Sequence, residues 1–306
     1  MDASSSEHPW TSAEPAPGRR PDRRPARRLQ ALLYLLTALT TFAAGTVGWE
    51  PVVLGIDADV AASLPAHWMR GVLYAAAVLA VLTAHEAGHF IAARLHGIPA
   101  TLPFFLPVPV LITGTLGAVI GMEGSRADRR QLFDIALAGP LAGLLVALPL
   151  LAIGMRDGIV TDANPFALPP LAAWMLGALR PDLVAGLTIA PNALFMAGWV
   201  GLLVTGLNMI PVSQLDGGHI AAAVFGRRSV WIARGTLLAA IAGIVLFGRY
   251  NWVVMVVMVA FIGTDHPPIR DADRPLGTLR TVLGLLAFII PLVTFMPEPL
   301  ALDGLE

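Results

Sequence analysis

The chain has 306 residues, of which 56% are hydrophobic and only 13% are charged, and its formal net charge at pH 7 is -1. An ordinary soluble domain carries roughly 25% charged residues, so this composition excludes one and predicts a protein solvated largely by lipid. Cysteine is absent, which excludes disulfides, thiolate metal ligands and a cysteine nucleophile. Any bound metal must therefore be held by His, Asp or Glu.

Residues 1–28 form a basic segment that is rich in Pro, Arg, Ser and Ala and has almost no large apolar side chains. Such a segment cannot bury enough surface to offset chain entropy, so we predict a disordered cytoplasmic tail. Its arginines stand just before the first apolar run, 29–48, where they indicate membrane orientation and not nucleic-acid binding. That run is about 20 residues long, which exceeds the apolar core of a signal peptide and predicts an uncleaved anchor.

Apolar stretches long enough to cross a hydrocarbon core of about 30 Å recur along the rest of the chain. They lie at 29–48, 70–96, 132–154, 185–210 and 281–296, and the stretch 231–265 is long enough for two more. The predicted fold is an all-α polytopic membrane protein with about six to seven transmembrane helices. Residues 301–306 are expected to be a short C-terminal tail.

One apolar stretch, 101–120, cannot form a spanning helix. The residues that interrupt a helix there are Pro103, Pro107, Pro109, Gly114, Thr115 and Gly117. Non-helical backbone at membrane depth survives only where protein buries it or where it lines a wet cavity, so we predict a short re-entrant segment that resembles a β-hairpin. The alternative is an apolar surface loop at the membrane interface.

Arginines recur in alternate connections between the apolar stretches, and the positive-inside rule assigns those connections to the cytoplasm. After the tail they are Arg126, Arg129, Arg130, Arg227, Arg228, Arg270, Arg274 and Arg280. The intervening connections hold Glu50, Asp57, Asp59, Asp157, Asp162 and Asp182. We therefore expect a multi-pass protein of a bacterial cell membrane with its N-terminus inside. The second span then starts outside near Arg70, and His85 lies about 22 Å along it, toward the cytoplasmic leaflet.

The apolar stretch 70–96 contains the motif His85-Glu86-Ala87-Gly88-His89. Histidines four residues apart project from one helix face and can bind one Zn²⁺, while the intervening Glu is placed beside the water that such a metal binds. Three ionisable groups inside a spanning helix are costly and normally mark function. The motif therefore favours a metal site over a purely structural pair of histidines.

A catalytic zinc usually has three protein ligands, so a third must come from elsewhere in the chain. Asp216 is the best-placed carboxylate, because it lies at the inner end of the fourth stretch on the same membrane side as His85. Its alternative role is an interfacial helix cap. Asp134 follows arginines at a span entrance, and Glu123 lies among loop residues. His219 stands at a wet boundary, where a histidine is more often solvated or hydrogen-bonded to backbone.

Several sequence segments occur in an order that resembles the site-2 protease family of intramembrane zinc metalloproteases, peptidase family M50. The segments are HEAGH at 85–89, GTLGA at 114–118, LFDIALAGPLAG at 132–143 and LNMIPVSQLDGGH at 207–219, with DHPP at 265–268 as a weaker match. HEAGH followed by an LDG segment in a polytopic chain is a specific combination. Many members also carry a PDZ domain, for which the connection 155–182 is too short.

The resemblance implies a set of roles for individual residues. His85, His89 and Asp216 would hold one Zn²⁺ per chain, and Glu86 would be the general base. Asn208 matches the family's asparagine just before the LDG segment, where its amide would hold the substrate or its developing oxyanion. A helix-packing amide is the alternative for Asn208. Residues 29–300 would form one transmembrane metalloprotease domain with its catalytic core at about 70–220.

The implied activity is hydrolysis of peptide bonds in single-pass transmembrane protein substrates, in contact with membrane lipid and without nucleic acid. An intact transmembrane helix hides its carbonyls, so the substrate must unwind. We expect it to add as a strand along 102–120, at Gly114, Thr115 and Gly117. The alternatives are a metal-ion transporter, which should show polar ligands on several spans, and an inactive relative, against which the presence of Glu86 argues.

Overall fold

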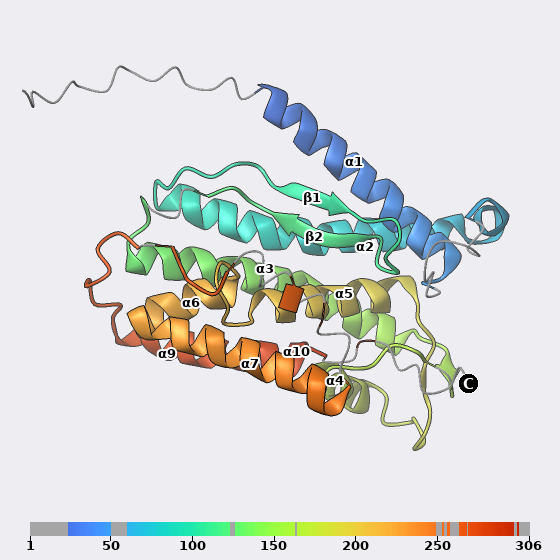
Figure 1. Cartoon of the computed structure of the whole chain (residues 1–306). Coiled ribbons are helices and arrows are strands. Elements are labelled where there is room, and N and C mark those ends of the chain that lie inside the picture. The colour runs from blue at the N-terminus through green and yellow to red at the C-terminus, as the bar shows by residue number, and fades with distance from the viewer. Residues whose placement is uncertain are drawn as a thin grey trace, which may run out of the picture.

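Helices dominate the structure of the chain, a computed structural model that is drawn in Figure 1. It describes residues 24–49, 60–122, 126–162, 164–248, 253, 256–257, 263–267, 269–296 and 299. Most of the predicted tail 1–28 lies outside the described residues, and residues 24–28 belong to the first helix. Glu50, Asp57, Asp59, Glu123 and the short tail 301–306 also lie outside them.

Long apolar helices form the centre of the molecule: α1 (Arg24–Val47), α2 (Val60–Leu95), α3 (Arg129–Arg156) and the shorter α5 (Ala193–Asn208). Helices in lipid gain little from burying apolar surface against one another, so close van der Waals packing decides how they associate. Small residues permit that packing. A Cβ on Gly198 of α5, for example, would lie 2.5 Å from the Leu151 Cβ of α3. The largest core cluster, which includes Tyr74, Phe195 and Trp199, fills the space among α2, α3 and α5.

The stretch 101–120 forms a β-hairpin, which confirms that part of the predicted fold. Strand β1 (Phe104–Pro107) pairs antiparallel with β2 (Thr115–Val119), with Phe105 opposite Ala118 and a bulge between Phe105 and Pro107. The hairpin packs on α1 and α2. Gly114, at the end of the turn, has φ +74° and lies so close to α1 that a Cβ would meet the Thr40 carbonyl oxygen at 2.6 Å. Only glycine fits both the turn and this contact.

The remaining elements complete the fold on the other side of α3 and α5 (Figure 1). They are β3 (Val160–Thr161), α4 (Pro170–Leu179), β4 (Thr188–Ile189), α6 (Asp216–Phe225), the 3₁₀ turn η2 (Gly226–Arg228), α7 (Ser229–Phe247), α9 (Thr278–Ala287) and α10 (Ile289–Thr294). Strands β3 and β4 pair antiparallel in the connection 155–182 and beyond. The connection also carries α4, a surface helix whose Trp174 is exposed.

Four helical segments of the described residues are long and apolar enough to cross a membrane: Ala26–Val47, Ala62–Leu95, Arg129–Arg156 and Asp216–Leu246. The expected count of six to seven spans is not confirmed. The stretch 185–210 becomes the 16-residue α5, and 281–296 belongs to two short helices that meet at Phe288. Helix α6 ends at Gly226, whose φ is +57°, and η2 and α7 follow directly, so the long apolar segment that begins at Asp216 is interrupted there. The second half of 231–265 is only partly described.

Candidate metal centre and catalytic cavity

Helix α2 presents His85, Glu86 and His89 toward the interior. The helix is regular through this region, so the two histidines lie one turn apart, and their rings meet edge to face with centroids 4.9 Å apart. The exposed fractions of the three residues are 3%, 4% and 6%, respectively. Burial of three ionisable groups in an apolar bundle is costly unless they are hydrogen-bonded, paired with opposite charge or coordinated to a metal.

Two glycines of α3 make room for these histidines. A Cβ on Gly139 would overlap the His89 ring, and a Cβ on Gly143 would lie 3.1 Å from His85 Nδ1. Gly88 of α2 faces the same helix, because a Cβ there would meet the Ala138 carbonyl oxygen at 2.5 Å. The segment LFDIALAGPLAG is therefore the helix face on which the histidines rest. Gly139 and Gly143 were not among the predicted site residues, although their four-residue spacing is the signal of one helix face packed closely on another.

Hydrogen bonds fix which ring nitrogens of the histidines are free. His89 Nδ1 lies 2.8 Å from the Ile135 carbonyl oxygen, which can only accept, so Nδ1 carries the proton and Nε2 of the neutral ring bears a lone pair. The amide nitrogen of Asn208 lies 3.3 Å from His85 Nε2 and donates to it. Both Nε2 atoms are therefore acceptors, and they face each other at 3.2 Å.

Asp216 completes the group from the first residue of α6. Its carboxylate oxygens lie 3.3 Å from His85 Nε2 and 3.3 Å from His89 Nε2. Oδ2 is buried and has no hydrogen-bond donor among the described residues. In the described part of the chain, His85, His89 and Asp216 are the only group of His, Asp or Glu arranged to hold a metal ion.

This donor set fits a zinc ion. Two donors bound to zinc at tetrahedral angles, with arms of about 2.0–2.1 Å, are about 3.3 Å apart, and the separations here are 3.2 and 3.3 Å. When both rings are neutral, these three lone-pair donors repel one another, and a divalent cation removes that repulsion. The carbonyl that binds His89 Nδ1 is the usual outer partner of a metal-binding histidine.

The other candidates for a third ligand have different surroundings. Asp134 accepts hydrogen bonds from the Arg280 guanidinium at 2.7 and 2.9 Å and lies 3.1 Å from His96 Nε2, away from the motif. His219 lies in the same cavity as the motif, but its Nδ1 is 2.6 Å from Nε2 of His266.

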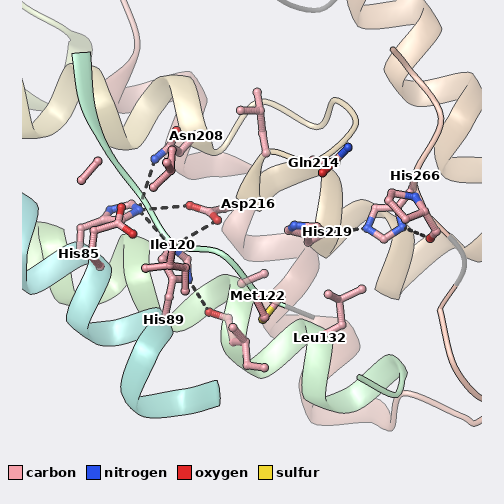
Figure 2. A pocket seen from close by; sticks show the side chains of 17 residues that line it. His85, His89, Ile120, Met122, Leu132, Asn208, Gln214, Asp216, His219 and His266 are labelled. Carbon is pink, nitrogen blue, oxygen red and sulfur yellow. Dashed lines mark hydrogen bonds and ion pairs between the residues drawn. The ribbon is translucent and has the colours of Figure 1, made fainter. Parts of the chain in front are cut away.

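A cavity of about 450 Å³ opens beside the three donors, and Figure 2 shows the side chains that line it. Glu86 and Asn208 line it together with the donors. One wall is the end of β2 and the residues after it, 118–120 and Met122, and another is formed by 214–216 and His219. The predicted substrate-binding residues Gly114, Thr115 and Gly117 are not among its lining residues.

Those three residues are placed inside the hairpin. Gly114 packs on α1, and the Thr115 hydroxyl donates to the Leu106 carbonyl at 3.0 Å and accepts from the Gly117 amide at 3.0 Å. Gly117 has φ +109°. They shape the hairpin, and the residues that follow them face the cavity.

The fold and the site together define a membrane-embedded metallopeptidase family. The chain belongs to peptidase family M50, whose model matches residues 73–248. This match includes the HEAGH motif, Asn208 and Asp216, and it favours the protease interpretation over a transporter or an inactive relative.

Proteins similar to this chain occur in plants. A protein of Arabidopsis thaliana named probable zinc metalloprotease EGY2, chloroplastic, is 35% identical over 254 residues, which covers 78% of this chain and 43% of that protein. Probable zinc metalloprotease EGY1, chloroplastic, of Oryza sativa subsp. japonica is 27% identical over 300 residues, covering 88% and 50%. The chain thus spans half or less of the length of these relatives. No solved structure matches it significantly.

Proposed function

We propose that the chain is an intramembrane zinc metalloendopeptidase with one Zn²⁺ held by His85, His89 and Asp216. The observation that carries this proposal is the convergence of three buried lone-pair donors beside a buried glutamate, on a helix long and apolar enough to span a membrane. When bound, Zn²⁺ supplies a Lewis acid that polarises a carbonyl and lowers the pKa of water.

Glu86 is the general base of this mechanism. Glu86 is the residue after His85 on α2, and it lines the cavity. Its carboxylate can accept a proton there from the water that attacks the scissile carbonyl carbon. It then returns this proton to the leaving amine as the C–N bond breaks. The Asn208 amide already points toward His85 Nε2, so it can donate to the oxyanion that develops during the attack.

Replacement of Glu86 by Gln tests the mechanism directly, because an amide of the same size cannot accept the proton. Purified Glu86→Gln protein should retain its zinc, measured by metal analysis, and lose at least about 100-fold of its cleavage rate. Asp273→Asn, the same change from carboxylate to amide at an exposed residue outside the cavity, is the matched control and should cleave within a few-fold of wild type. Cleavage by Glu86→Gln at the wild-type rate would refute the mechanism.

The substrates that suit this site are single-pass transmembrane proteins, which must present an extended segment to the cavity. Strand β2 has one strand neighbour, β1, among the described residues, and the chain just after it lines the cavity. An unwound substrate segment can pair along 118–122 and recover backbone hydrogen bonds that it lost on unwinding. This keeps the strand addition expected from the sequence but moves it past Gly114, Thr115 and Gly117.

Helix breakers in the substrate should therefore control cleavage. A synthetic single-span peptide with two glycines in its cytoplasmic half should be cut roughly tenfold or more faster than one with leucines there, since each glycine weakens a helix by about 1 kcal/mol. A peptide with the same glycines in the opposite half is the control. Equal rates for all three peptides would exclude unwinding as the limiting requirement.

The proposed orientation places the N-terminus and the cavity toward the cytoplasm, and it rests on the arginine distribution. In the described connections, arginines lie near the N-terminus of α3, in η2 and around 270–280, whereas the connection 155–182 holds Arg180, which is paired with Asp182. A reporter that is active only in the cytoplasm, fused at Met1, should be active. Activity only of a periplasmic reporter would reverse the assignment.

A further inference from the structure

A second pair of histidines lies at the end of the cavity away from His85. His219 comes from α6, one turn after Asp216, and His266 comes from the segment before α9. Their rings meet edge to face with centroids 4.9 Å apart, and His219 Nδ1 is 2.6 Å from His266 Nε2. Both residues line the cavity, although the catalytic mechanism above uses neither.

The hydrogen bonds of this pair fix the tautomer of each ring. His266 Nδ1 lies 2.6 Å from the Pro267 carbonyl oxygen, so Nδ1 must carry a proton. Burial lowers the pKa of His266, against a smaller opposing effect of that carbonyl, so the ring is neutral at pH 7 and its Nε2 is an acceptor. His219 Nδ1 must then be the donor between the rings. Nε2 of neutral His219 is left as an acceptor.

That acceptor faces the cavity. Figure 2 shows one nitrogen of His219 directed at His266 and the other side of the ring directed toward Asp216 and the cavity. Among the described residues, the His219 ring makes its hydrogen bond through Nδ1, to His266, and none through Nε2. The opposite wall is the segment 118–122, along which an extended chain would pair. A strand in that position has backbone groups on both edges, and the second edge faces α6.

His266 is held in place by the strap, which we define as residues 263–267 and 269–277. The Arg274 guanidinium binds the Asp128 carboxylate, Arg130 Nε donates to the Pro275 carbonyl at 2.8 Å, and Arg270 bridges to Asp128 through backbone. Asp128 also caps α3, accepting from the Arg130 and Gln131 amides. The strap is therefore attached to the N-terminus of α3, and its other end brings His266 to the cavity.

We propose that His219 is a substrate-binding residue whose Nε2 accepts one backbone N–H of the extended substrate, and that His266 is a positioning residue that fixes the tautomer required. The proposal rests on the proposed function, because it assigns a contact within the same cavity. It also gives His219 and His266 a role in the cavity, although neither belongs to the group of candidate metal ligands. The ligand recognised is a peptide backbone in strand conformation, bound between 118–122 and α6.

Backbone esters test this contact, since replacing one amide by an ester removes a single N–H. A synthetic single-span peptide that wild type cleaves is prepared with one ester at each position around the scissile bond in turn. Affinity is measured with Glu86→Gln protein, which binds without cutting. One ester position should weaken binding about three- to tenfold, the worth of one hydrogen bond.

The histidine variants then locate the partner of that N–H. In Glu86→Gln/His219→Phe the same ester should have no effect, while the all-amide peptide binds about three- to tenfold more weakly than to Glu86→Gln. His266→Leu, which leaves α6 intact, should reduce the ester effect, and His266→Gln, which retains an acceptor, should preserve it. Zinc content near that of wild type verifies folding in each variant.

An ester profile that is the same with and without His219 would overturn the proposal, as would a full ester effect in His266→Leu. Cleavage of the all-amide peptide by wild type is measured in parallel. Failure of that cleavage would contradict the proposed function, whereas normal cleavage with an unchanged ester profile would contradict only the role of His219.

Discussion

The cavity contains two histidine pairs, which differ in whether a proton lies between the two rings. His85 and His89 direct two lone pairs at each other across 3.2 Å, with the Asp216 carboxylate 3.3 Å from both. His219 and His266 share a proton across 2.6 Å. The first pair can hold a cation between its two nitrogens, whereas the two rings of the second pair are joined by a hydrogen bond. Two histidines that lie close together are thus insufficient evidence for a metal site. The hydrogen-bond partner of each ring nitrogen determines whether a lone pair is left for a metal.

The two pairs also differ in how they are supported. The first pair rests on helix backbone, because α3 approaches α2 closely at Gly139 and Gly143. The second pair joins a helix to the strap, which is attached through side chains around Asp128. A backbone contact cannot yield to an added side chain, while an ion pair near the surface can be lost at modest cost. Changes to the two supports should therefore have effects of different kinds.

The largest effect is expected from Gly139→Ala. Its methyl group would overlap the His89 ring and displace one donor, so zinc affinity should fall about 10- to 100-fold and cleavage should fall with it. Zinc affinity is measured by competition with a chelator. Alanine is the better helix former by about 1 kcal/mol, so loss of helix propensity cannot produce this result.

Gly235→Ala in α7 is the matched control for that substitution. A Cβ there would have no atom within 4 Å, so zinc affinity and cleavage should remain at wild-type values. If Gly139→Ala bound zinc as tightly as Gly235→Ala, the supporting role of the α3 backbone would be wrong.

A smaller effect is expected from Asp128→Ala, which removes both the α3 cap and the attachment of the strap. Stability should fall by about 1–2 kcal/mol, measured as a lower Tm in detergent, with zinc content unchanged. Burial alone would raise the pKa of Asp128, but hydrogen bonds from the Gln131 and Arg130 amides and the Arg274 guanidinium lower it overall. The stabilisation is therefore present above the unfolded-state pKa of about 3.9 and is lost as pH falls through the lower folded-state value.

The Tm difference between wild type and Asp128→Ala should consequently shrink as the pH is lowered below about 4. Asp273→Ala, at an exposed residue of the same strap, is the control and should change Tm little. A loss of zinc in Asp128→Ala would show that the strap supports the metal centre, against the separation of the two supports.

Sequence reasoning could predict the first pair because its geometry is local. A regular helix places His85 and His89 on one face whatever surrounds it. The choice of Asp216 over Asp134 is different, since it depends on Arg280, 146 residues away from Asp134, whose guanidinium engages that carboxylate. Only tertiary structure brings such partners together, so the sequence left both carboxylates as candidates.

The hairpin was predictable from its prolines and glycines, whereas its contacts were not. Gly114 permits a close approach, as expected, but the chain that approaches is α1 and not a substrate. The span boundaries had a similar outcome. Arg227 and Arg228 suggested a break between spans, and α6 does end beside them, at Gly226 with φ +57°, but η2 and α7 follow directly, so no long connection separates two spans there. A local sequence pattern indicates where the backbone is flexible or polar, but tertiary packing determines which contacts those residues make.

Zinc content of matched histidine variants tests most directly the claim that only the first pair holds the metal. Wild type should contain about one zinc per chain, His89→Ala and Asp216→Asn should lose most of it, and His219→Phe and His266→Gln should keep it. Metal analysis of the five purified proteins gives the answer without an activity assay. Full zinc in His89→Ala, or its loss in both His219→Phe and His266→Gln, would contradict the account.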